Sequence, residues 1–139
     1  MKGFLLTLGL LATNALLAAD VEVTVLGIDE VKGQVLIGFF DKEEDFQENP
    51  IPQSPLVKVM EAGPLVAVAK DLPPGIYSLA VIWDQNMNNV LDKKGFFAKP
   101  VEPYGFSNNP GTALGPPKYE ETTFLVPEEG GKITIQLVD

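Results

Sequence analysis

The chain has 139 residues, of which 10 are basic and 19 are acidic, and its formal net charge at pH 7 is −9. It contains no cysteine and no histidine, and all of its basic residues are lysines. This composition excludes disulfides, thiolate metal sites, a histidine general base and capture of phosphate by arginine forks. The acidic balance also argues against a nucleic-acid partner, because neutralising phosphates requires a basic surface.

Residues 1–19 have the pattern of a secretory signal peptide. Met1-Lys2 is positively charged, Phe4 to Leu17 is almost continuously apolar, and Ala18-Ala19 precedes Asp20. We therefore expect cleavage after Ala19, export to the periplasm or the extracellular space, and no stable membrane insertion after cleavage. The alternative is a retained anchor, because Leu17 stands where the peptidase prefers a small residue.

Residues 20–139 are long enough for a single domain with its own core. Strand-like patterns cover residues 21–25, 35–40, 57–59, 65–70, 76–83, 122–126 and 133–138, and only residues 41–49 have helical character, with Phe46 placed to dock a short helix on a sheet. Turn signals rich in Pro and Gly separate the strands, and residues 99–118 read as one long loop. The pattern predicts an all-β fold, an antiparallel two-sheet β-sandwich of about seven strands, Ig-like or transthyretin-like.

The apolar face of each predicted strand indicates the core. Tyr77, Leu79, Val81 and Trp83 share one face, because side chains alternate along a strand, so Trp83 is expected inside. The residues expected in the core are Val23, Val25, Val35, Ile37, Leu79, Val81, Phe124, Ile133 and Ile135.

A short loop over residues 84–92 carries the pattern of a calcium site. Asp84, Asn86 and Asn88 place side-chain oxygens at alternating positions, Val90 can offer its carbonyl, and Asp92 adds a second carboxylate. Calcium takes six to eight such oxygens, but Gly95 stands where an EF-hand loop has its glutamate, so Glu102 or water would have to complete the shell. The alternative for Glu102, which we prefer, is an exposed carboxylate at the rim of the long loop. If the loop binds calcium, we expect a dissociation constant of around 10⁻⁴ to 10⁻³ M, because the loop itself contains only two carboxylates. The alternative is a turn without metal, since Asp and Asn side chains also bond nearby backbone amides.

The long loop contains a second candidate site. Aromatic rings and polar side chains alternate there in a combination suited to a glycan or peptide ligand. The residues are Tyr104, Phe106, Ser107, Asn108 and Asn109. The alternative is that the two aromatic residues pin the loop to the sandwich.

Two stretches resemble a known family. Leu72-Pro73-Pro74-Gly75-Ile76-Tyr77 is similar to a turn and strand of transthyretin-like and prealbumin-like modules of exported proteins. Trp83-Asp84-Gln85-Asn86-Met87-Asn88, followed by Glu102-Pro103-Tyr104-Gly105-Phe106-Ser107-Asn108-Asn109, resembles domain-of-unknown-function family 2141. The resemblance spans the mature chain and implies an exported bacterial sandwich domain with no established activity. Family members carry a histidine where this chain has Trp83, so no role of that imidazole transfers.

These observations together favour a non-catalytic exported β-sandwich module of unknown role with a weak calcium-binding loop. The alternative is a glycan- or peptide-binding or adhesion module that uses the 99–118 loop. An enzyme is not expected, because histidine is missing and the adjacent Glu120 and Glu121 would point to opposite faces of a strand.

Overall fold

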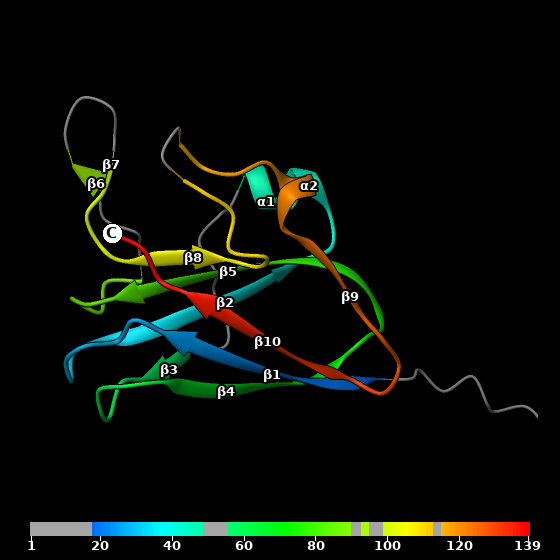
Figure 1. Cartoon of the computed structure of the whole chain (residues 1–139), viewed down its shortest axis with the longest axis horizontal. Coiled ribbons are helices and arrows are strands. Elements are labelled where there is room, and N and C mark those ends of the chain that lie inside the picture. Colours follow the sequence, from blue (N-terminus) through cyan, green and yellow to red (C-terminus); the bar gives the residue numbers. More distant parts are fainter. Residues whose placement is uncertain (1–17, 49–55, 90–92, 95–98, 113–114) are drawn as a thin grey trace, which may run out of the picture.

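The computed structural model describes residues 18–48, 56–89, 93–94, 99–112 and 115–139. Its two main sheets enclose an apolar core (Figure 1). One sheet has the strand order β10-β1-β4, and the other has the order β3-β2-β5-β8, with β9 also paired to β5. The predicted all-β two-sheet sandwich is confirmed.

The seven predicted strands are all present, and each end lies within two residues of its prediction. The first sheet is formed by β1 (Ala19–Leu26), β4 (Leu65–Leu72) and β10 (Gly131–Gln136). The second is formed by β2 (Gln34–Phe40), β3 (Leu56–Lys58), β5 (Gly75–Asp84), β8 (Tyr104–Phe106) and β9 (Thr123–Val126). A small ribbon pairs β6 (Lys93–Lys94) with β7 (Lys99–Pro100), and the described helices are α1 (Glu43–Glu48) and α2 (Tyr119–Thr122).

Strand β1 lies in the middle of its sheet and joins distant parts of the chain. It runs antiparallel to β4 and parallel to β10, so that Val23 pairs with Ala67 on one side and with Ile133 on the other. The parallel pair departs from the otherwise antiparallel arrangement of the described strands. A sequence pattern does not reveal the direction in which two strands pair when they are more than a hundred residues apart, as Val23 and Ile133 are.

Strand β5 is the longest of the described strands and is buried from Tyr77 to Asp84. It pairs with β2 along one edge, and β8 and β9 share its other edge. The face that points away from the core is covered as well, because Phe46 of α1 packs its ring against Phe40, Phe106 and Tyr119. This explains why β2 and β5 are apolar on both faces, and it confirms that Phe46 docks the helix on the sheet.

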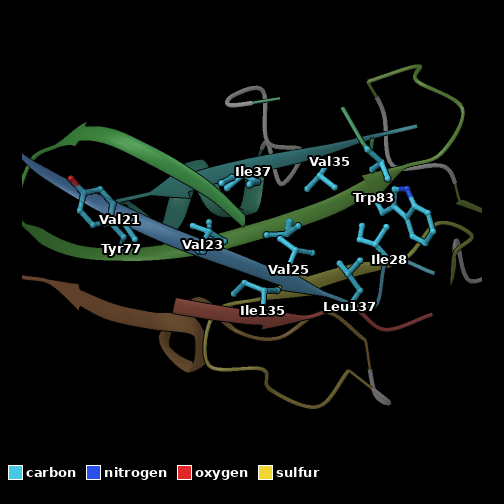
Figure 2. Close-up of a cluster of buried hydrophobic side chains, with 14 of the residues drawn as sticks. Val21, Val23, Val25, Ile28, Val35, Ile37, Tyr77, Trp83, Ile135 and Leu137 are labelled. Carbon is cyan, nitrogen blue, oxygen red and sulfur yellow. The ribbon is translucent and has the colours of Figure 1, made fainter. Parts of the chain in front are cut away.

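The core is built from the inward faces of both sheets (Figure 2). Seven of the nine predicted core residues are buried, and the other two, Phe124 and Ile133, are partly buried against the cluster. Tyr77 and Trp83 lie on the same face of β5, at opposite ends of the cluster drawn in Figure 2. The expected core position of Trp83 is confirmed.

The segment expected to be one long loop contains regular structure. Strand β8 lies inside it, because residues 104–106 pair with the part of β5 that β9 does not reach. Thr122, expected to begin a strand, ends α2 instead, and its buried hydroxyl lies 2.7 Å from that of Ser78. No helix in the described part of the chain is long and apolar enough to cross a membrane.

Tyr77 combines a buried ring with a hydrogen-bonded hydroxyl. The hydroxyl donates to the carbonyl of Pro73 at 2.6 Å, and the ring meets Phe39 edge-on with centroids 6.0 Å apart. Burial raises the pKa of this hydroxyl above its ordinary value of about 10, and the negative charge of Asp41 raises it further. The folded state therefore holds the phenolic proton more tightly than the unfolded chain does.

We expect Tyr77→Phe to lower the free energy of unfolding at neutral pH by about 0.5–1.5 kcal/mol, because the bond to Pro73 is lost. Below about pH 10 the stability that comes from the raised pKa of Tyr77 is fully present, and it is lost as the pH rises toward the folded pKa, because the unfolded chain ionises first. The gap between wild type and variant should therefore narrow above about pH 10. Urea denaturation at several pH values measures this gap, and a constant gap would contradict the assignment.

Candidate functional site

The candidate calcium loop begins where β5 ends. Asp84 is the last residue of β5 and pairs with Gln34, the first residue of β2. Asp84 is 0% exposed, although the turn from Gln85 to Asn89 that follows it lies at the surface. A buried carboxylate thus stands directly beneath an exposed loop. Val90 and Asp92, two of the other four predicted ligands in this loop, lie outside the described residues.

The carboxylate of Asp84 accepts hydrogen bonds from three groups. The backbone amide of Asn88 donates to Oδ1 at 3.2 Å, and the amide of Asn89 donates to Oδ2 at 2.7 Å. The side-chain amide of Gln34 donates to Oδ2 at 2.9 Å. A carboxylate has about four lone-pair directions, so these bonds occupy Oδ2 and leave Oδ1 one further direction for a ligand.

Gln34 is a site residue that the sequence analysis did not identify. Its Nε2 donates to Asp84 and also to Oδ1 of Asn89, the latter at 2.7 Å, so one amide ties β2 to the base and to the far end of the turn. The side chain is buried. The available signal was a polar residue that opens an apolar strand directly after a glycine.

Gly33 lets this loop pack directly against the backbone before β2. Its φ is +67°, and a Cβ at this position would lie 2.3 Å from the carbonyl oxygen of Asp84 and 2.7 Å from Cα of Gln85. Real Cβ atoms do not approach backbone so closely. Any side chain at position 33 would therefore push the turn away from Gln34.

We expect Gly33→Ala to destabilise the protein more than Gly63→Ala does. Both glycines have a positive φ, but a Cβ on Gly63 would meet nothing within 4 Å. Gly63→Ala, the control, should therefore lower the free energy of unfolding only by the backbone strain, about 1–2 kcal/mol. Gly33→Ala also displaces the turn, which should lower it by about another 1–2 kcal/mol. Urea denaturation of both variants measures the difference. Equal losses would show that the turn does not depend on contact with Gly33.

Side chains of the loop shape its own backbone. Met87 and Asn89 have φ values of +60° and +64°. Asn89 stands where an EF-hand loop has glycine, and asparagine tolerates this left-handed conformation better than most residues. Oδ1 of Asn86 accepts from the amide of Asn88 at 3.2 Å. These are the contacts of an Asx turn, the arrangement that the sequence analysis gave as the alternative to a metal loop.

Glu102 folds back onto the same turn from the chain before β8. Its residue is 4% exposed, and its Oε2 accepts from the backbone amide of Gln85 at 2.7 Å. The carbonyl of neighbouring Pro103 accepts from the amide of Trp83 at 2.9 Å. The side chains of Asp84 and Glu102 therefore both bond to the backbone of one five-residue stretch. Among the described residues, no group of three or more Asp, Glu, His or Cys side chains is gathered closely enough to hold a metal ion.

An open hollow lies beside the turn. Gln85, Asp29, Glu30 and Asp139 are among the residues that line it, and most of its surface is polar. Lys32 partly offsets this charge, because its ammonium group lies 3.7 Å from a carboxylate oxygen of Glu30. The carboxylates that line the hollow give this end of the sandwich an excess of negative charge, which attracts cations weakly.

The polar residues of the second candidate site make bonds within the protein. The hydroxyl of buried Ser107 accepts from the amide of Leu79 at 2.9 Å. Asn108 donates to the carbonyl of Thr123 at 2.8 Å, and Asn109 both donates to the carbonyl of Thr134 at 3.2 Å and accepts from the amide of Gln136 at 2.8 Å.

The aromatic residues of this segment are also in contact with neighbouring rings. Phe106 meets Tyr104 at 5.9 Å and Phe46 at 5.8 Å between ring centroids. These contacts fit a segment that is anchored to the sandwich. Ligand recognition by the segment stays a prediction.

The fold and the loop together define a small two-sheet β-sandwich domain with an Asx-rich turn at one end. The chain belongs to the family described as "Uncharacterized protein conserved in bacteria (DUF2141)", whose model matches residues 23–135. This confirms the resemblance found in the sequence. No curated protein matches the chain, and no solved structure does.

Proposed function

We propose that the protein is a non-catalytic, exported β-sandwich module whose loop over residues 84–92 binds calcium weakly. The observation that supports calcium binding is the placing of two buried carboxylates, Asp84 and Glu102, against the backbone of one surface turn. Export rests on the leader-like residues 1–19. The non-catalytic reading rests on the composition, which offers no histidine or cysteine.

The chemistry of the loop suits a hard cation. The side-chain oxygens of the loop belong to carboxylates and amides, which are ligands that calcium prefers. Oδ1 of Asp84 accepts one hydrogen bond, from Asn88, and keeps a further lone pair for a metal ion. None of the described lysine side chains forms an ion pair with Asp84. A calcium ion would neutralise the negative charge of Asp84, which in the structure accepts hydrogen bonds from neutral N–H groups.

The calcium proposal predicts a calcium-dependent rise in stability. Since only the folded loop gathers the ligands, about 10 mM calcium should raise the free energy of unfolding by about 1.4–2.7 kcal/mol, for dissociation constants between 10⁻³ and 10⁻⁴ M. Magnesium should do less, because it requires compact octahedral geometry and retains its waters. Thermal melting with chelator, calcium or magnesium measures the effect. A melting midpoint that calcium does not move would return the loop to the status of an Asx turn.

The alternative function is a glycan- or peptide-binding or adhesion module that uses residues 99–118. A mainly apolar hollow supports it, since ring faces and amides suit such ligands. Its lining includes Phe106, Asn109, Pro110 and Gln136. The internal bonds of Asn109 reduce what its amide can offer a ligand. A glycan array probed with the folded protein would test it.

A further inference from the structure

The bond at which we expect the leader to be cut lies inside a strand of the folded domain. Ala19 is the first residue of β1, is 4% exposed and pairs with Leu72 of β4. Two residues further on, Val21 is 2% exposed and lies between Ala69 of β4 and Gly131 of β10. Both residues of the bond between Ala19 and Asp20 therefore lie in β1, where the register with β4 shifts between Ala19 and Val21 and Asp20 is exposed.

Asp20 is also held by contacts with β4 and with the turn before β10. Its Oδ1 accepts a hydrogen bond from the backbone amide of Asp71 at 3.2 Å. Its carbonyl oxygen would lie 2.4 Å from a Cβ placed on Gly130, which has a φ of +83°, so the turn before β10 reaches this oxygen only because residue 130 is glycine.

A peptidase needs the scissile bond freely accessible in its own active site. A bond in a paired strand becomes accessible only when the strand opens, so the cutting rate follows the population of the open form. We infer that the fold conceals its own processing site. The leader is removed from the unfolded chain, and folding with the leader attached prevents its removal. This inference rests on the export part of the proposed function.

The reaction itself is a hydrolysis catalysed by a leader peptidase. Water adds across the peptide bond, the carbonyl carbon of Ala19 becomes a carboxylate, and the nitrogen of Asp20 leaves as the new amino terminus, which takes up a proton. The end of β1 that carries this bond pairs with β4, through Ala19 and Leu72, whereas the pairing of β1 with β10 begins at Val21. The bond therefore remains accessible until β4 has paired with this end of β1.

One experiment with the full precursor tests whether the leader can be cut before folding but not after it. The precursor is diluted from denaturant into detergent micelles with purified leader peptidase present from the start, or with the peptidase added after the fluorescence of Trp83 has reached its folded value. We expect a product that begins at Asp20 in the first case, and cutting at least about tenfold slower in the second. Equal rates would overturn the inference. Absence of cutting in both cases would instead overturn the predicted leader.

Two controls separate burial of the bond from other obstacles. A Gly-Ser spacer of about six residues between Ala19 and Asp20, roughly 20 Å when extended, moves the bond out of the sheet. This precursor should be cut equally fast in both orders; if it also resists after folding, the micelle protects the leader and the inference fails. Gly130→Ala should speed the cutting of the folded precursor, because its Cβ meets the carbonyl of Asp20. Gly63→Ala, which has a positive φ but open space, should not, and an equal effect of both variants would contradict the inference.

Discussion

Replacing Trp83 by alanine is expected to lower the free energy of unfolding by about 3–5 kcal/mol, the range found when a large buried aromatic side chain is removed. Trp83 is 1% exposed and belongs to the main core, where its backbone pairs with Val35. Its indole N–H also donates to the carbonyl of Lys32 at 2.8 Å, which ties β5 to the turn before β2. The substitution removes apolar contact and leaves that carbonyl without its donor.

Trp83→Phe separates these two losses. Phenylalanine keeps much of the buried apolar volume but has no N–H for Lys32, so its cost should be clearly smaller than that of alanine. Urea denaturation followed by circular dichroism measures both variants without relying on tryptophan fluorescence. A loss below about 1 kcal/mol for Trp83→Ala would show that this end of the core is not packed as described.

Replacing Asp84 by alanine is expected to lower the free energy of unfolding by about 2–4 kcal/mol, even without calcium. Three N–H donors lose the carboxylate of Asp84 as their acceptor. They are the backbone amides of Asn88 and Asn89 and the side-chain amide of Gln34. Hydrogen bonds to charged groups contribute more than neutral ones, and a buried donor left without an acceptor carries the full cost of its lost hydration. The turn should loosen, and any stabilisation by calcium should disappear with it.

Asp45→Ala is the matched control, since it removes one carboxylate from the exposed face of α1. It should leave the calcium response unchanged, which separates a specific site from general attraction to an acidic protein. Asp84→Asn keeps the shape but turns an NH₂ group toward groups that themselves donate, so it should also destabilise the turn. If Asp84→Ala melts with wild-type stability and the same calcium shift, neither role assigned to Asp84 holds.

Local patterns in the sequence were sufficient to predict most strands. Alternation of valines with polar residues predicted β1, an apolar run predicted β2, and alternation after a Pro-Pro-Gly turn predicted β5, because periodicity records which faces are buried. The same patterns placed Trp83 in the core. Glu102 was a candidate to fold back on the Asn-rich turn, but an exposed carboxylate at the rim was the preferred interpretation. That preference was wrong, because Glu102 is 4% exposed and bonds to Gln85.

The parts that sequence reasoning missed depend on contacts between distant segments. The role of Gln34 follows from its position opposite Asp84 across two paired strands, which no local pattern encodes. Strand β8 was hidden in a stretch rich in Pro, Gly and Asn, because it owes its existence to the free edge of β5 more than to its own propensity. Gly105 also allows β8 to lie close to β10 of the other sheet, since a Cβ there would lie 2.6 Å from Cγ2 of Ile135.

The parallel pairing of β1 and β10 has a consequence for building larger molecules from this domain. The ends of most domains lie close together, which makes circular permutation easy. Here the first and last strands run side by side in the same direction over six paired positions, so β1 starts at one pole and β10 finishes at the other (Figure 1). A permutant would need a linker of about 20 Å along the sheet. Protein domains fused before β1 and after β10 would therefore lie at opposite ends of this sheet and would not contact each other through short linkers.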